Sequence, residues 1–62
     1  MEIELFKVYE LNDYGKMIFE TDRIFIGQKS NIENFYIVLF PNAKGEILKW
    51  NVKEFLIKQA VK

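Results

Sequence analysis

Carboxylate pairs are the arrangement in this sequence whose type and spacing could support acid–base catalysis. Glu2 and Glu4 share one face of an extended strand, and Glu20 and Asp22 repeat that spacing. Two carboxyl groups act as acid and base only in a concave pocket that excludes water. A chain of 62 residues rarely encloses such a pocket, so we interpret both pairs as solvated surface.

Other catalytic side chains are scarce. The sequence has no histidine or cysteine, and it has a single serine, threonine and arginine (Ser30, Thr21 and Arg23). Nucleophile–base pairs of the usual kinds therefore cannot form, and a structural zinc site of cysteine and histidine ligands is excluded. No phosphate-binding glycine loop or calcium loop is present. We predict a protein that is not an enzyme and that has no catalytic residues, metal or cofactor.

Aromatic side chains with a polar tip are the first candidate binding residues: Tyr9, Tyr14, Tyr36 and Trp50. Tyrosine and tryptophan are enriched at interaction hot spots, because they give a large contact area at a low entropy cost. Tyr14 lies in a turn-like stretch and is expected to be exposed, whereas core packing is the competing interpretation for Tyr36 and Trp50. This set predicts a protein partner.

Basic side chains are the second candidate set, and they would bind a nucleic acid: Arg23, Lys29, Lys44, Lys49, Lys53 and Lys58. The net charge is zero, yet residues 1–22 hold two basic and six acidic residues, whereas residues 23–62 hold seven basic and three acidic residues. Small barrels bind single strands with lysines and aromatic platforms. Scattered lysines and attraction between the two halves are the competing interpretation, because the strongly basic footprint of nucleic-acid binders is missing.

The segment Phe35–Phe40 (FYIVLF) is the longest apolar run, and the other elements are expected to pack around it. Its length and its aromatic and β-branched residues predict a central strand that is buried on both faces. Three arrangements could cover both faces: a sheet closed into a small barrel, a homodimer, or a partner protein on the second face.

The N-terminal half is predicted to consist of strands. Residues 2–11 form the first strand, with a β-bulge near residues 5–6 that exchanges its faces. Residues 12–15 (NDYG) form a turn. Residues 16–28 then form either one long bent strand or two strands that are separated at residues 21–23.

Turn and cap signals divide the middle of the chain. Gly27 is expected to mark either a bulge or a close approach of the backbone. Ser30 and Glu33 fit a capping box, which predicts one helical turn. Residues 41–45 (PNAKG) predict the turn of a hairpin, in which Gly45 is the left-handed closing residue, and the second strand covers residues 46–51.

The C-terminal stretch has two interpretations. Asn51 and Glu54 fit an N-cap with an acidic third position, which predicts a helix over residues 52–61. The alternative is a 3₁₀ turn at residues 52–55 that is followed by a final strand at residues 56–60.

The second half of the chain resembles part of an SH3-like small barrel over residues 35–57, through Tyr36 and Val38, Gly45, Trp50, Glu54 and Phe55. Tudor- and chromo-type modules have a similar order: an apolar strand, a glycine turn, a strand that ends in an aromatic residue, and a helical turn. The overall plan is also similar to that of the small archaeal chromatin proteins, although those are markedly basic. The resemblance implies only a fold. It assigns neither an aromatic cage nor a function to residues of this chain.

These features predict one domain over residues 1–62 that is mainly β (α+β). It has four or five antiparallel strands in a curved sheet or SH3-like barrel, with a C-terminal helix or helical turn. We expect a small protein-binding module, and a nucleic-acid-binding barrel is the alternative. The many Ile, Lys, Asn and Phe residues indicate an AT-rich genome, and an accessory or inhibitor protein of a phage or mobile element fits this size. We expect an intracellular, cytoplasmic location, because cysteines, a signal pattern and a bilayer-spanning apolar stretch are absent.

Overall fold

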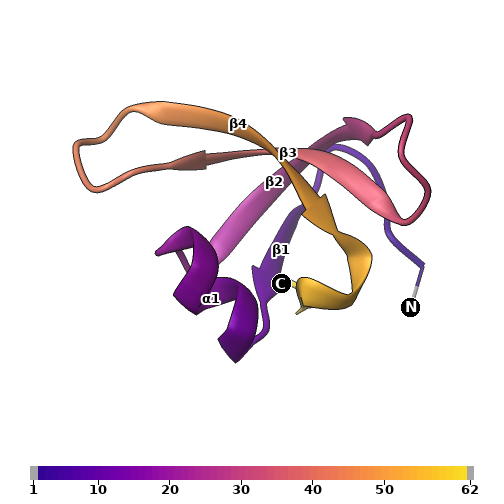
Figure 1. The fold of residues 1–62 in the computed structure, drawn as a ribbon, viewed down its shortest axis with the longest axis horizontal. Coiled ribbons are helices and arrows are strands. Elements are labelled where there is room, and N and C mark those ends of the chain that lie inside the picture. Colours follow the sequence, from indigo (N-terminus) through magenta and orange to yellow (C-terminus); the bar gives the residue numbers. More distant parts are fainter. Residues whose placement is uncertain (1, 62) are drawn as a thin grey trace.

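The structure, a computed structural model, describes residues 2–61 of the chain. Within this range it is mainly β, as the sequence predicts: five antiparallel strands form one open sheet, with one short α-helix and one 3₁₀ helix (Figure 1). The predicted domain of residues 1–62 also includes Met1 and Lys62, which lie outside the described residues. No helix in the described range is long and apolar enough to cross a membrane.

The strands are not arranged in the order of the chain. The elements are β1 (Val8–Leu11), α1 (Asp13–Phe19), β2 (Arg23–Lys29), β3 (Phe35–Pro41), β4 (Ile47–Lys53), the 3₁₀ helix η1 (Glu54–Leu56) and β5 (Ile57–Ala60). The order across the sheet is β4-β3-β2-β1-β5, and every neighbouring pair is antiparallel. Strands β4 and β5 are therefore the two edges of the sheet.

The core lies on one face of the sheet, which we call the inner face. Its buried side chains come from every strand and from η1: Tyr9, Leu11, Ile24, Ile26, Val38, Phe40, Val52, Leu56 and Ile57. On β3, only Val38 and Phe40 are buried. The alternate residues of β3 lie on the opposite, outer face and stay partly exposed: Phe35, Ile37 and Leu39. The prediction that this strand is buried on both faces is wrong, because α1 and η1 both pack on the inner face.

Strand β2 contains the predicted bulge at Gly27. Ile26 lies opposite Val38 of β3, but the next pair is Gln28 with Ile37, so β2 accommodates one extra residue. Because of this extra residue, Gln28 lies on the outer face although it is only two positions from the buried Ile26. The prediction for Gly27 is confirmed.

Helix α1 occupies a stretch that was predicted to be a turn and the start of a strand. The Oδ1 atom of Asn12 accepts a hydrogen bond from the Gly15 N–H at 2.8 Å, which caps the helix. The helix ends at Glu20, which has a left-handed backbone with φ of 54°. The predicted turn at residues 12–15 is wrong, and the second strand begins at Arg23 instead of Lys16. Helix caps and turns use the same residue types, so the pattern alone did not separate them.

The first strand is shorter than predicted, because residues 2–7 are not part of it. The chain turns at residues 5–6, close to the predicted bulge, and Phe6 has a φ of 61°. This N-terminal segment is fixed to the sheet at two points. The Phe6 N–H donates to the carbonyl oxygen of Ile26 at 2.7 Å, and the Glu4 N–H donates to the Tyr9 hydroxyl at 2.9 Å.

Two helical predictions in the second half are wrong. At the predicted capping box, Ser30 Oγ accepts from the Ile32 N–H at 3.2 Å, but the segment forms a turn that ends at Asn34 with a φ of 68°. The predicted helix over residues 52–61 is replaced by η1 and β5, as the alternative interpretation stated. Strand β5 forms because β1 supplies backbone partners for it, with Tyr9 opposite Ala60.

The β3–β4 hairpin is confirmed. Its strands pair from Phe35 with Lys53 to Pro41 with Ile47. In the turn, Asn42 Oδ1 accepts from the backbone N–H groups of Lys44 and Glu46, each at 2.9 Å. Gly45 takes a φ of 83°, in the left-handed region that glycine adopts without steric cost.

We predict that Gly45→Ala destabilises the protein by about 1 kcal/mol. The space around the added methyl group is open, so backbone strain is the cause of this loss. Urea unfolding measures the free energy of unfolding, and Gly45→Asn is the matched control because asparagine tolerates this conformation better. Equal stability of the alanine variant and the wild type would contradict the prediction.

Asn12 joins the start of α1 to η1, and its removal tests that connection. Its Nδ2 group donates to the carbonyl oxygen of Phe55 at 2.8 Å, in addition to the cap. We predict that Asn12→Ala lowers the free energy of unfolding by about 2 kcal/mol, through loss of the cap and of this hydrogen bond. Asn12→Asp keeps the capping oxygen and loses the N–H donor, so its free energy of unfolding should lie between those of the wild type and Asn12→Ala. An aspartate variant as stable as the wild type would show that the bond to Phe55 contributes nothing.

Candidate functional site

An apolar cleft lies between α1 and the inner face of the β3–β4 hairpin. It has a volume of about 180 Å³ and is lined by Ile18, Phe19, Phe40, Leu48 and Trp50. In Figure 1 the hairpin extends past the rest of the sheet, and α1 lies below the extended part. We call this site the α1–β4 cleft.

The register of β3 and β4 directs two large side chains into the α1–β4 cleft. Trp50 lies opposite the buried Val38 and Leu48 lies opposite the buried Phe40, so both point to the inner face. Helix α1 does not reach far enough to cover them. Trp50 is 59% exposed and Leu48 37% exposed, and across the cleft Ile18 is 50% exposed.

The floor of the cleft is an aromatic pair. The rings of Phe19 and Phe40 lie with their centroids 5.7 Å apart and their planes at 70°. This edge-to-face packing fixes the end of α1 against β3. The floor is therefore set by the fold, whereas the exposed rim of Ile18, Leu48 and Trp50 is free to contact another molecule.

The cleft borders a free sheet edge. Strand β4 pairs with β3 on one side, and within residues 2–61 no strand pairs with its other side. Such an edge presents unpaired backbone N–H and C=O groups to any extended chain that approaches. The α1–β4 cleft and the β4 edge together form a surface with both apolar and backbone hydrogen-bonding capacity.

A larger and more polar hollow, of about 440 Å³, lies on β1, β2 and β5 and is lined by Glu10, Arg23, Gln59, Ala60 and Val61. Both carboxylate oxygens of Glu10 already have partners. Oε1 accepts from Gln59 Nε2 at 3.0 Å, and Oε2 accepts from Lys16 Nζ at 3.2 Å. The hydrogen bond from Gln59, and next that from Lys16, lowers the pKa of Glu10. A carboxylate held in its charged form is unsuited to donate a proton.

The predicted carboxylate pairs are on the surface. Glu4 forms an ion pair with Lys7, with 2.6 Å between Nζ and Oε2, and Glu20 and Asp22 are exposed. In the described range no group of three or more Asp, Glu, His or Cys residues is arranged to hold a metal ion.

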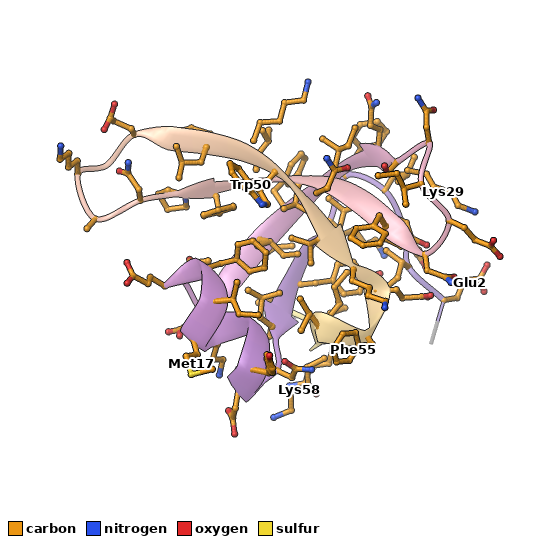
Figure 2. All side chains as sticks on the ribbon, viewed as in Figure 1. Glu2, Met17, Lys29, Trp50, Phe55 and Lys58 are labelled. Atoms are coloured by element: carbon orange, nitrogen blue, oxygen red, sulfur yellow. The ribbon has the colours of Figure 1, made fainter. Side chains whose placement is uncertain are left out.

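The four aromatic candidates lie in different environments. Tyr9 is buried, at 3% exposure, and belongs to the core. Tyr36 is half-buried, and burial, followed by the charge of Glu54, raises the pKa of its hydroxyl. Tyr14 is exposed on α1, and Trp50 is exposed in the α1–β4 cleft, as Figure 2 shows for Trp50 on β4.

Ile18 and Leu48 line the cleft although they were not predicted as site residues. The residue pattern placed Ile18 in a strand, so its position on a helix that faces Trp50 was not visible. A signal for Leu48 was present, because in a strand it lies two residues before Trp50 and therefore on the same face.

The basic candidates divide into two groups. Lys44, Lys49 and Lys53 lie on the β3–β4 hairpin. Lys44 is in its turn, and Lys49 and Lys53 lie on the outer face of β4, opposite Leu39 and Phe35. The others lie elsewhere: Arg23 and Lys29 at opposite ends of β2, and Lys58 on β5 at the other edge of the sheet (Figure 2). The structure does not bring the six together on one face.

Comparisons with known proteins give no relative for this chain. No protein-family model matches it, and neither the curated proteins nor the solved structures contain a significant match.

The lowered pKa of Glu10 predicts a pH dependence of stability. A carboxyl group whose folded pKa lies below its ordinary value near 4.5 stabilises the fold above that pH, and the contribution is lost as the pH falls through the folded pKa. We expect the difference in free energy of unfolding between the wild type and Glu10→Gln to be largest above about pH 5 and to shrink in more acidic solution. Chemical unfolding at a series of pH values measures it.

Glu33→Gln is the control for this titration, since Glu33 lies in the exposed β2–β3 turn. The difference in free energy of unfolding between Glu33→Gln and the wild type should change little with pH. A difference for Glu10→Gln that stays constant from neutral to acidic pH would contradict the assignment of Lys16 and Gln59 as partners of an ionised carboxylate.

Proposed function

We propose that the protein is a non-enzymatic protein-binding module that holds an extended segment of its partner along β4. The observation that carries this proposal is the position of three exposed apolar side chains, Ile18, Leu48 and Trp50, beside an unpaired sheet edge. Backbone hydrogen bonds to the β4 edge supply affinity in this mode of recognition, and every second side chain of the bound segment supplies specificity.

The chemistry of the rim defines the partner segment. Because side chains of a strand alternate, those of the added segment that share the inner face would lie over the α1–β4 cleft. Trp50 and Leu48 favour apolar side chains there, and Trp50 has the size and rigidity of a hot-spot residue. Lys49 and Lys53 line the outer face of the same strand, which favours acidic or polar residues at the alternate positions.

The fold supports a relationship to SH3-like small barrels. The order β3, glycine turn, β4 and helical turn supports it, although the five strands form an open sheet. We also propose that the chain is a cytoplasmic accessory or inhibitor protein of a phage or mobile element. Its small size supports this, and so does its high content of Ile, Lys, Asn and Phe, which indicates an AT-rich genome. The alternative, nucleic-acid binding, has less support. Of the six basic candidates, only Lys44, Lys49 and Lys53 lie together on the β3–β4 hairpin.

Peptide selection tests this proposed function. Short random peptides are selected from a display library against the wild-type protein, and their affinity is measured by the fluorescence of Trp50, the single tryptophan. We expect selected peptides with apolar residues at alternate positions. Ile18→Ser and Leu48→Ser should each weaken their binding by about tenfold, because each removes part of the rim while Trp50 remains as the probe.

Ile32→Ser is the matched control, because Ile32 is also exposed but lies in the β2–β3 loop outside the cleft. It should leave peptide affinity unchanged. Peptides that bind both rim variants as tightly as they bind the wild type would contradict a site in the α1–β4 cleft, and so would failure to select any peptide.

A further inference from the structure

We propose that a second copy of this chain binds at the β4 edge, so that two β4 strands pair antiparallel about a two-fold axis at Trp50. This inference rests on the proposed function, and it names the partner segment as β4 itself. Three observations carry it: the length of the free edge, the positions of its lysines, and the apolar residues that the pairing would bring together.

The length of β4 favours one register. An antiparallel pair related by a two-fold axis perpendicular to the sheet places one residue opposite itself, and residues at equal distances on either side face one another. Trp50 is the middle residue of Ile47–Lys53. An axis at Trp50 therefore pairs the whole strand, whereas an axis at Lys49 or Asn51 leaves two residues of each strand without a partner.

The lysines disfavour the two neighbouring registers. With the axis at Lys49, this residue would face its own copy. With the axis at Asn51, Lys49 would face Lys53 of the second copy, and this pair would occur twice. Like charges directly opposite each other destabilise a strand pair. With the axis at Trp50, Lys49 faces Asn51 and Lys53 faces Ile47, so no two charges of the same sign lie opposite.

The inner face gains apolar contacts in the register centred on Trp50. The two Trp50 side chains lie opposite each other, and Leu48 lies at the position opposite Val52 of the second copy, whose side chain is already buried in its own core. The gain therefore comes mainly from the two Trp50 side chains. Cross-strand aromatic and aliphatic pairs stabilise antiparallel strands. Trp50, which is 59% exposed in the single chain, would thereby lose contact with water at the centre of the interface.

Lysines on an edge strand have a competing explanation, which is that they keep edges apart and prevent aggregation. That explanation does not require the lysines to favour any one register. In β4 the spacing of Lys49 and Lys53 instead leaves no like charges directly opposite each other in the fullest overlap, whereas it places them opposite each other in the two adjacent registers. The lysines therefore select a register.

Replacing Asn51 by a negative or a positive residue tests the register, because the two charges should have opposite effects on dimer affinity. Asn51 is exposed on the outer face of β4, opposite Ile37 of β3. In the proposed dimer each Asn51 faces Lys49 of the other copy. We expect Asn51→Glu to lower the dimer dissociation constant and Asn51→Lys to raise it, each by about three- to tenfold, since two identical pairs change in each dimer.

Sedimentation equilibrium of the full chain at low salt measures these constants, and the concentration dependence of Trp50 emission is an independent readout. Asn31→Glu and Asn31→Lys are the charge-matched controls, because Asn31 is exposed in the β2–β3 loop and makes the same change in net charge. Urea unfolding of all variants checks that the monomer fold is retained. Both control variants should dimerise like the wild type.

Other results would overturn the inference in distinguishable ways. If both Asn51 variants weaken the dimer, Asn51 faces itself and the axis is not at Trp50. If the wild type stays monomeric at all concentrations, β4 does not self-associate. In that case peptides that bind the α1–β4 cleft would still support the proposed function, whereas a monomer that also binds no peptide would contradict both.

Discussion

The structure depends on how much of one sheet face the rest of the chain can cover. The inner face of a five-stranded open sheet is apolar, and within residues 2–61 only α1, η1 and a short N-terminal segment are available to pack on it. These elements bury the part of the sheet around β1, β2 and the adjoining end of the hairpin. They do not extend over β4 between Leu48 and Trp50, which explains why these two residues share the inner face with buried residues and yet remain exposed.

The apolar cleft and the free edge meet on the part of the β3–β4 hairpin that projects beyond the rest of the sheet (Figure 1). β2, β3 and β4 have seven residues each, but the pairing of β2 with β3 ends at Phe25 and Leu39, so the hairpin continues past its neighbour. A projecting hairpin has one side chain face that no helix covers and one backbone edge that no strand completes. The uncovered side chains and the unpaired backbone edge belong to the same strand, so a molecule that pairs with the edge lies next to those side chains. We therefore treat the α1–β4 cleft and the β4 edge as one surface.

The features that could be predicted from the sequence are those that depend on neighbouring residues. The hairpin, the left-handed Gly45 and the bulge at Gly27 follow from local turn chemistry and from side-chain alternation. Helix α1 could not be predicted in this way, because seven residues are too few to separate a period of 3.6 from a period of 2. The contact that holds its first turn, from Asn12 to Phe55, joins distant parts of the chain. The exposure of Trp50 was equally hidden, since a pattern shows which face a residue is on and not how far a helix extends over that face.

The pairing of β1 with β5 has a consequence for the order in which the chain folds. These strands come from opposite ends of the described range, and the Val61 N–H donates to the Val8 carbonyl oxygen at 3.0 Å. The β3–β4 hairpin closes a short loop, whereas the β1–β5 pair closes a loop that contains nearly the whole domain, at a much larger entropic cost. We expect the hairpin to form early and β5 to dock late. During synthesis, β4 would therefore be formed and accessible before the last strand of its own sheet is in place.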